Sequence, residues 1–178
     1  SLTSGNVSMG IAAIARITGV PNRLEIAETA AQSLLLEQSV TPLVAMWAKA
    51  GLALLAVQTG DQSAAAEHYS YLLGQQSTMA STVISADRLL GLLSQTMGDL
   101  DQATEHFEDA LVFCREAGYR PELTWTCCDY ADMLLERDDE GEKSKATSLL
   151  GESLAISSEL GMRPLMERVL SRREILKA

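Results

Sequence analysis

The chain has 178 residues, of which 47% are hydrophobic and only 4% are aromatic, and alanine and leucine supply most of the apolar side chains. This composition favours helices, and no run of residues alternates as a strand would, so we predict an all-α fold without a sheet. The formal net charge of −10 repels a phosphate backbone, which argues against nucleic acid as a direct partner.

Membrane insertion and disulfide formation are also not expected. The chain has no continuous run of the roughly 20 apolar residues that a membrane span needs. Its three cysteines are an odd number, and two of them are adjacent at Cys127 and Cys128. Such cysteines do not form a disulfide framework, so we expect a reducing, cytoplasmic location.

An internal repeat organises the chain. Gly60–Leu73 aligns without gaps on Gly98–Leu111 at an offset of 38 residues, and a weaker copy lies another 38 residues earlier, around Ala27. Ala146–Pro164 aligns on Ala103–Pro121 at an offset of 43. A repeat of this length, with two helical patterns in each unit, predicts a stack of helical hairpins.

The predicted elements follow in chain order. Residues 1–5 are expected to be a disordered lead-in or a cloning remnant. Two amphipathic helices in each unit cannot bury their apolar sides alone, so the units must stack on one another. The predicted helical hairpins lie at residues 6–38, 41–75, 79–118 and 121–161, and a capping helix lies at 164–177.

The third unit shows the helical signals most clearly. Leucines recur at helical spacing within Ala86–Met97. Gly98 then ends that helix, and Asp99 can accept hydrogen bonds from the first turn of the next one. Gly118 ends the second helix, and Pro121 permits a new start. The remaining units are interpreted from this one.

The same unit resembles a tetratricopeptide repeat, which has Leu-Gly in its first helix and Ala-x-x-x-Phe-x-x-Ala in its second. The matching residues are Leu90, Gly91, Ala103, Phe107 and Ala110. The resemblance implies a right-handed superhelical solenoid of about four hairpins plus the C-terminal cap. The offsets of 38 and 43 exceed the usual 34 residues, and most copies lack the large aromatic residue of the first helix.

The long repeats resemble the arrays of large bacterial signal-transduction ATPases and transcriptional regulators. The resemblance implies that the chain is a segment of a larger signalling or transcription-regulating protein. No GxxxxGK[ST] phosphate loop occurs in the sequence. Any ATPase module would therefore lie outside these 178 residues.

If the units stack as tetratricopeptide repeats do, their first helices line a concave face. We predict that this face binds a protein or peptide, which another domain of the same parent chain could supply. Self-association is a further possibility. Besides Met9, the residues predicted to face inward are Arg16, Trp47, Leu54, Arg88, Gln95, Trp125, Cys128 and Asp132.

Two features of this face bear on its ligand. Trp47 and Trp125 occupy the same slot of their repeats, where each ring either anchors a peptide or is buried between repeats. The Lys and Asn clamp with which some family members hold a carboxylate is absent, because its slots contain residues such as Ala50 and Leu92. An amphipathic helix or a mixed-charge peptide suits the face better.

Catalytic signatures are missing from the sequence. It contains no nucleophile elbow, phosphate loop or HExxH motif, so we expect neither an enzyme nor a bound metal or cofactor. His68 and His106 occupy equivalent slots one unit apart, which repeat ancestry explains better than metal binding. The leading hypothesis is a non-catalytic interaction scaffold with a regulatory role. The alternative is a domain that senses a small-molecule effector.

Overall fold

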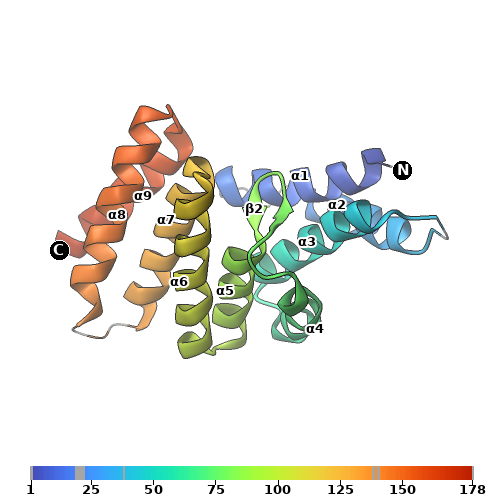
Figure 1. Ribbon diagram of the computed structural model, residues 1–178, viewed down its shortest axis with the longest axis horizontal. Coiled ribbons are helices and arrows are strands. Elements are labelled where there is room, and N and C mark those ends of the chain that lie inside the picture. Colours follow the sequence, from blue (N-terminus) through green and yellow to red (C-terminus); the bar gives the residue numbers. More distant parts are fainter. Residues whose placement is uncertain (1, 19–22, 38, 138, 140, 178) are drawn as a thin grey trace.

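The computed structural model describes residues 2–18, 23–37, 39–137, 139 and 141–177 (Figure 1). This part of the chain is mostly helical, which confirms the predicted helical fold class. Its α-helices are α1 (Leu2–Thr18), α2 (Leu24–Leu35), α3 (Pro42–Thr59), α4 (Gln62–Leu72), α5 (Ala86–Met97), α6 (Leu100–Ala117), α7 (Arg120–Arg137), α8 (Glu142–Glu159) and α9 (Arg163–Lys177).

The N-terminus differs from the prediction. The helix α1 begins at Leu2, so residues 2–5 are helical and do not form a disordered lead-in. Residue 1 lies outside the described part of the chain. The apolar residues that follow Gly10 continue this helix to Thr18 without a helix-breaking proline or glycine.

A short β-hairpin interrupts the helices, so the prediction that no sheet occurs is wrong. After α4 and a 3₁₀ turn at Leu73–Gln75, strand β1 (Met79–Ser81) pairs antiparallel with β2 (Ile84–Ser85). The predicted helical hairpin 79–118 therefore begins with strands, and its first helix starts only at Ala86. Residues 82–84 are the β-branched run Thr-Val-Ile, which favours an extended backbone.

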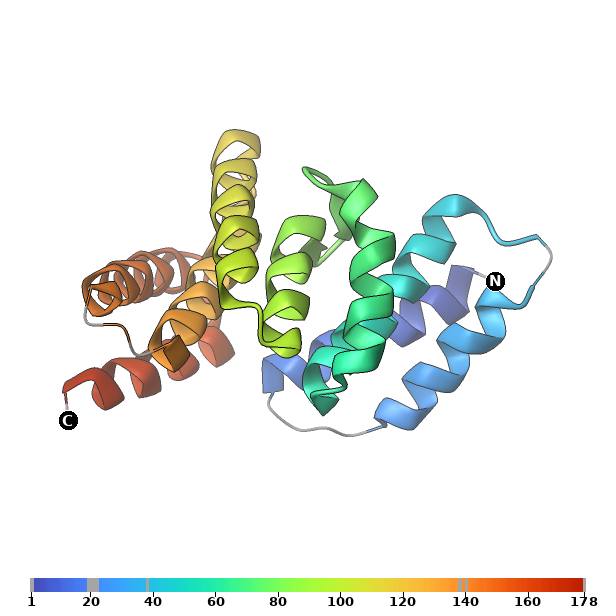
Figure 2. The same cartoon turned by 90° about the horizontal axis from the view of Figure 1, so that it is seen from below.

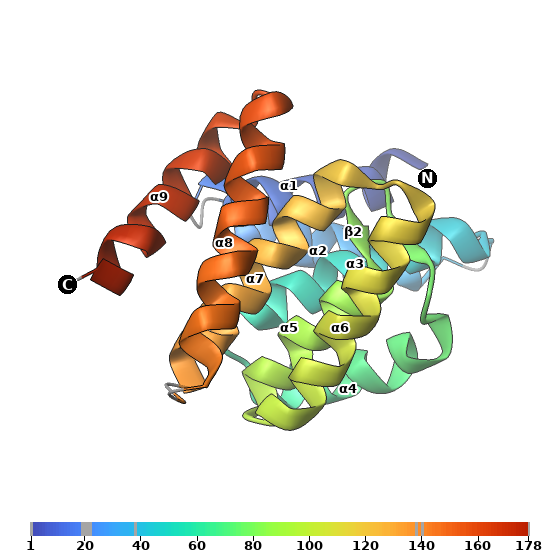
Figure 3. The same ribbon diagram turned by 60° about the vertical axis from the view of Figure 1, so that its left-hand side comes forward.

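The helices pack in chain order. Each helix contacts the next, and the odd-numbered helices also contact one another along one side, α1 with α3, α3 with α5 and α5 with α7. Figure 2 shows the successive pairs following one another from the N-terminus to the C-terminus. The array is curved, so that α9 contacts α8, α7 and also α1 (Figure 3). The two ends of the helical array therefore meet.

Side-chain oxygens and glycines fix several helix ends. Asp61, Ser85 and Asp99 accept hydrogen bonds from the backbone N–H of Ala64, Arg88 and Gln102, which stabilises the starts of α4, α5 and α6. Gly98 and Gly118 have φ values of 86° and 70°, a left-handed conformation that glycine adopts at little cost. The predicted helix stops at these two glycines are confirmed.

The hydrophobic core runs between the paired helices. Leu89, Leu90 and Leu93 of α5 are fully buried, as the leucine spacing predicts. The ring of Phe107 stacks on that of Tyr130, with ring centroids 5.2 Å apart, which joins α6 to α7. This core holds the inner side of the array in place.

One described helix, α3, is long and apolar enough to cross a membrane by length and composition alone. It carries Lys49 near its middle, and 44% of its residues are buried inside the fold. A core helix of a water-soluble protein has the same properties, so this helix is weak evidence for a membrane span.

Gly91 provides a test of the close packing between α5 and α6. An added Cβ at Gly91 would lie 3.1 Å from three carbons of the Phe107 ring, whereas one at Gly151 of α8 would meet nothing within 4 Å. We expect Gly91→Ala to lower the free energy of unfolding by about 1 kcal/mol, because overpacking outweighs the gain in helix propensity. Gly151→Ala should raise it by up to about 1 kcal/mol. Urea denaturation of both variants measures the difference, and equal shifts of the same sign would contradict it.

Candidate functional site

Asp129 on α7 lies at the centre of a group of buried charges. Its Oδ1 accepts hydrogen bonds from Arg16 Nη2 of α1 at 2.6 Å and from Arg168 Nη2 of α9 at 3.3 Å. Its Oδ2 accepts a hydrogen bond from Arg88 Nη1 of α5 at 2.9 Å. The carboxylate has no exposed surface. A single side chain thus joins four helices that are distant in sequence.

Arg88 extends this group to the β-hairpin. Its Nε donates to Glu122 Oε1 at 2.8 Å, and its Nη2 donates to the carbonyl oxygen of Val83 at 3.2 Å. Glu122 Oε1 also accepts hydrogen bonds from the backbone N–H and the hydroxyl of Ser85, at 2.7 and 2.9 Å. Every guanidinium nitrogen of Arg88 therefore has a partner, and the hairpin is held against α7.

Asp132, three residues after Asp129, binds two arginines of α9. Its Oδ2 accepts a hydrogen bond from Arg168 Nη2 and its Oδ1 accepts one from Arg172 Nε, both at 2.7 Å. Asp132 and these arginines are only partly buried. We call the whole group the charge network, and its members are Arg16, Arg88, Arg168, Arg172, Glu122, Asp129 and Asp132.

The network controls the ionisation of its members. Burial alone would raise the pKa of Asp129, but the three arginines around it outweigh burial and lower the pKa to about 2. For Arg88, burial lowers the pKa, and the charges of Glu122 and Asp129 more than reverse that effect. Asp129 and Arg88 are therefore both charged at neutral pH.

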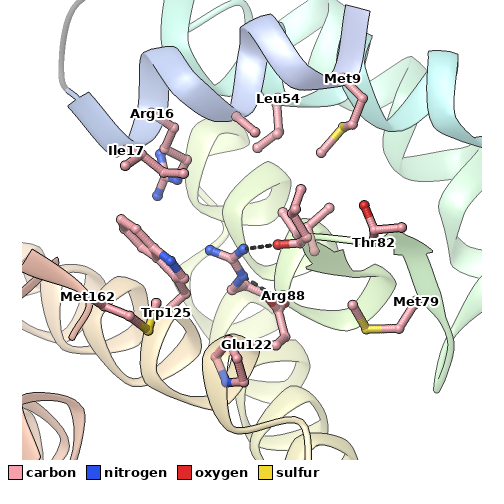
Figure 4. Close-up of a pocket in the computed structure, with 14 residues that line it drawn as sticks. Met9, Arg16, Ile17, Leu54, Met79, Thr82, Arg88, Glu122, Trp125 and Met162 are labelled. Carbon is pink, nitrogen blue, oxygen red and sulfur yellow. Dashed lines mark hydrogen bonds and ion pairs between the residues drawn. The ribbon is translucent and has the colours of Figure 1, made fainter. Parts of the chain in front are cut away.

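A cavity of about 230 Å³ lies beside the charge network (Figure 4). A cavity of ~150 Å³ holds one benzene molecule, so this one has room for roughly nine non-hydrogen atoms. Its wall is mainly apolar, with a few charged side chains. The lining residues are Met9, Ala13, Arg16, Ile17, Leu54, Met79, Thr82, Val83, Ile84, Arg88, Pro121, Glu122, Trp125 and Met162.

Trp125 is the aromatic residue of this wall. Its ring centroid is 5.9 Å from the Cζ atoms of both Arg88 and Arg168, which is within the range of a cation–π contact. Only 8% of the residue is exposed. Trp47 on α3 is half-buried and does not line the cavity. The two tryptophans, predicted to occupy the same slot, therefore have different surroundings.

Two polar atoms of cavity-lining residues have no hydrogen-bond partner in the part of the chain that the structure describes. They are Arg16 Nε and Glu122 Oε2, and both are buried. An unsatisfied buried group costs about 1–3 kcal/mol, so folded proteins contain few of them. Arg16 and Glu122 thus have unused hydrogen-bonding capacity, one as a donor and the other as an acceptor.

The eight residues that were predicted to bind a partner lie in different parts of the structure. Cys128 is fully buried, and Trp47 lies away from the cavity. Gln95 donates a hydrogen bond to Glu136 on the open side of the charge network, where Asp132 also lies. The four that line the cavity are Arg16, Leu54, Arg88 and Trp125.

These positions correct the picture of an open peptide groove. Leu54, Arg88, Trp125 and Cys128 are all buried, and so is Met9. They are covered because α9 returns to α1 and the β-hairpin covers part of the inner side. A peptide cannot lie along these five residues without displacing those elements.

Several residues of the site were missed by the sequence prediction. Asp129 and Glu122 were not selected, although Asp129 and Asp132 are three residues apart and share a helix face. Arg168 lies on the predicted capping helix and was not selected either, although its side chain points into the array. The sequence did contain a signal for this network. Acidic residues occupy inward positions of α7, and Arg88 occupies an inward position of the preceding unit.

The histidines and cysteines offer little reactive chemistry. His106 Nε2 lies 2.8 Å from the hydroxyl oxygen of Tyr69, and burial lowers the pKa of His106. Burial raises the pKa of Cys114 to about 11 and that of Cys128 to about 12, and it raises the pKa of Cys127 as well. Among the described residues, no group of three histidine, cysteine or acidic side chains could hold a metal ion.

Comparison of the chain with protein-family profiles, curated proteins and solved structures finds no significant match in any of the three. The comparisons assign the chain to no family. Its function therefore has to be argued from the cavity and the charge network.

Replacing the central carboxylate tests the charge network. We expect Asp129→Asn to lower the free energy of unfolding by about 3 kcal/mol or more at pH 7, because it leaves buried arginines without their shared partner. The lowered pKa of Asp129 means that its stabilisation is complete above about pH 4 and is lost as the pH falls toward 2. The gap between wild type and variant should narrow over that range in urea denaturation.

Asp109→Asn is the matched control for this substitution, because Asp109 is exposed on α6. It should change the free energy of unfolding by less than about 0.5 kcal/mol. A gap between wild type and the Asp129 variant that is constant from pH 7 to pH 2 would show that the network does not hold Asp129 ionised.

Thiol labelling tests the burial of the cysteines. Because Cys114, Cys127 and Cys128 are buried and their thiolates are disfavoured, a disulfide reagent at pH 8 should label none of them quickly in the native protein. All three should react in 6 M guanidinium chloride. Rapid release of one equivalent of reporter from the native protein would contradict the packing around these residues.

Proposed function

We propose that this chain is a non-catalytic regulatory module that senses a small effector molecule in the cavity beside the charge network. The single observation that supports this is a preformed, mainly apolar cavity with a few charged groups in its wall. Binding sites for small molecules typically have this character. Its volume of about 230 Å³ lies just below the ~300–1,000 Å³ of typical ligand pockets, so it suits a small ligand.

The proposal includes a tetratricopeptide-like solenoid as the scaffold. It is supported by the chain-order packing of the helices, the contacts among the odd-numbered helices and the four repeat units. In such an array the inner side is built from every unit, so a ligand bound there contacts helices from both ends. Binding can then change how the units sit against one another.

An enzyme is a weaker proposal for the same cavity. Glu122 and Asp129 are each ion-paired to Arg88, and the buried thiols are held in their neutral form. General acid–base or nucleophilic catalysis needs a titratable group that is free to exchange a proton near neutral pH. The described wall of the cavity contains no such group.

An interaction scaffold remains the second candidate, favoured by a different surface. An open channel between α2 and α4 has an apolar floor that includes Leu52 and Leu55, and its rim carries Glu28, Asp61 and Glu67. An acidic rim around an apolar floor complements a basic amphipathic segment. We propose that an effector signal would pass to such a partner within a larger cytoplasmic signalling or transcription-regulating protein.

A thermal-shift screen tests effector binding. We expect at least one member of a library balanced among acids, amides, amines and sugars to raise the unfolding midpoint, because a ligand at 100 times its Kd stabilises the native state by about 2.7 kcal/mol. Ala13 lines the cavity, so Ala13→Phe should fill it and abolish the shift. Ala66 is exposed on α4, and Ala66→Phe should retain the shift.

Circular dichroism and urea denaturation establish that both phenylalanine variants are folded before the comparison. A shift that persists in the Ala13 variant would place the ligand elsewhere. A library that shifts neither the wild type nor the Ala66 variant would count against effector sensing and favour the scaffold.

A further inference from the structure

We propose that the cavity binds a small monocarboxylic acid with an apolar body, and that Arg16 receives its carboxylate. This inference rests on the proposed function, since it names the class of ligand for the same cavity. It is argued from the charge balance of the cavity wall, from the hydrogen bonds that the arginines of the network already make, and from the distribution of polar groups around the wall.

The charged residues in the wall of the cavity have an excess of positive charge. They are two arginines, Arg16 and Arg88, and one carboxylate, Glu122, whereas the whole chain has a net charge of −10. A positive excess at a mostly buried site is costly, because the low dielectric there weakens its solvation. An anion in the cavity would offset that cost, and a cation would increase it. The wall therefore favours a ligand with one negative charge.

Arg16 is the arginine with donors to spare at the cavity. Arg88 already donates from all three of its guanidinium nitrogens. Arg168 does not line the cavity, and it is engaged with Asp129 and Asp132. Within the described part of the chain, Arg16 donates one hydrogen bond, from Nη2 to Asp129. Its Nε is unpaired but has almost no accessible surface, so Nη1 is the donor that remains for a ligand.

The electrostatic surroundings of Arg16 agree with this assignment. Burial lowers the pKa of Arg16, the charge of Asp129 opposes that change, and Arg168 and Arg88 lower the pKa further. The guanidinium is thus less well compensated than that of Arg88, whose pKa is raised. A carboxylate bound to Arg16 Nη1 would make a charge-assisted hydrogen bond and supply the missing compensation.

The rest of the wall limits the ligand to one acid group. Glu122 is the carboxylate of the lining, and its negative charge would repel a second carboxylate. Around Arg16, Arg88 and Glu122 the rest of the wall is mainly apolar, with side chains such as Met9, Leu54 and Met162 (Figure 4). An apolar body of a few carbon atoms fits there, and a dicarboxylate does not.

Three probes of nearly equal size test the assignment: phenylacetate, phenylacetamide and phenethylammonium. In a Trp47→Phe background, Trp125 is the sole tryptophan and lines the cavity, so its fluorescence reports occupancy. Isothermal titration calorimetry on the unaltered chain provides an independent affinity. We expect phenylacetate to bind at least tenfold more tightly than the amide, and the ammonium compound to bind most weakly.

Two arginine substitutions separate a contact from a general charge effect. Arg16→Gln should weaken phenylacetate binding at least tenfold and change phenylacetamide binding less than threefold. Arg172→Gln removes the same charge from the network at a position that does not line the cavity. It should leave the phenylacetate affinity within threefold of wild type.

The outcomes distinguish this inference from the proposed function. If phenylacetamide binds as well as phenylacetate, and its binding is lost in Ala13→Phe, the cavity is a ligand site but the carboxylate assignment is wrong. Equal losses in the Arg16 and Arg172 variants would also overturn the role of Arg16. If none of the probes binds at millimolar concentration, the monocarboxylate class is rejected, and the thermal-shift screen decides whether the cavity binds any ligand.

Discussion

The helical array depends on the burial of one ionised carboxylate. An isolated charge inside a protein is strongly disfavoured, so Asp129 requires cations close to it, and removing them would leave a large uncompensated cost. Those cations come from α1, α5 and α9. Because the first and last helices both reach α7, the C-terminal end of α1 lies against α9.

Closure of the array determines what its inner side can bind. Stacked helical pairs normally present a long inner surface to an extended ligand. Here the inner side is occupied by the charge network at one place and covered by the β-hairpin at another, and the space that remains is small and partly enclosed. A small molecule in that space would contact Arg16 and Trp125 together, and so would bridge α1 and α7.

The sequence predicts the local features of this fold well. The leucine spacing of α5 and the stops at Gly98 and Gly118 depend on residues within one or two helical turns, and they were all identified. The repeat also placed Arg88 and Trp125 on the inner side. These features could be predicted because helix periodicity and end signals are local properties of the chain.

The features that were missed depend on distant parts of the chain. Asp129 meets Arg16 across 113 positions, and no repeat spacing indicates that α9 returns to α1. The β-hairpin was not predicted because its strands have three and two residues, too few to show the alternation of apolar and polar residues that marks a strand. It is anchored by the hydrogen bonds of Ser85 to Glu122, which again depend on tertiary structure. The inner side that the sequence predicts as an open groove is therefore a partly enclosed cavity in the structure.

The attachment of the β-hairpin has a practical consequence for protein engineering. Its position is set by Ser85 and the Val83 carbonyl, and on the other side by the hydrogen bonds that link Ser77 to Asp87 and Thr78 to Ala86. The turn that precedes it is exposed at Leu73 and Gly74, and an added Cβ at Gly74 would meet nothing within 4 Å. Extra residues inserted at Gly74 would lengthen this turn without moving the cavity wall. The position is thus a natural point at which to insert a fluorescent reporter domain.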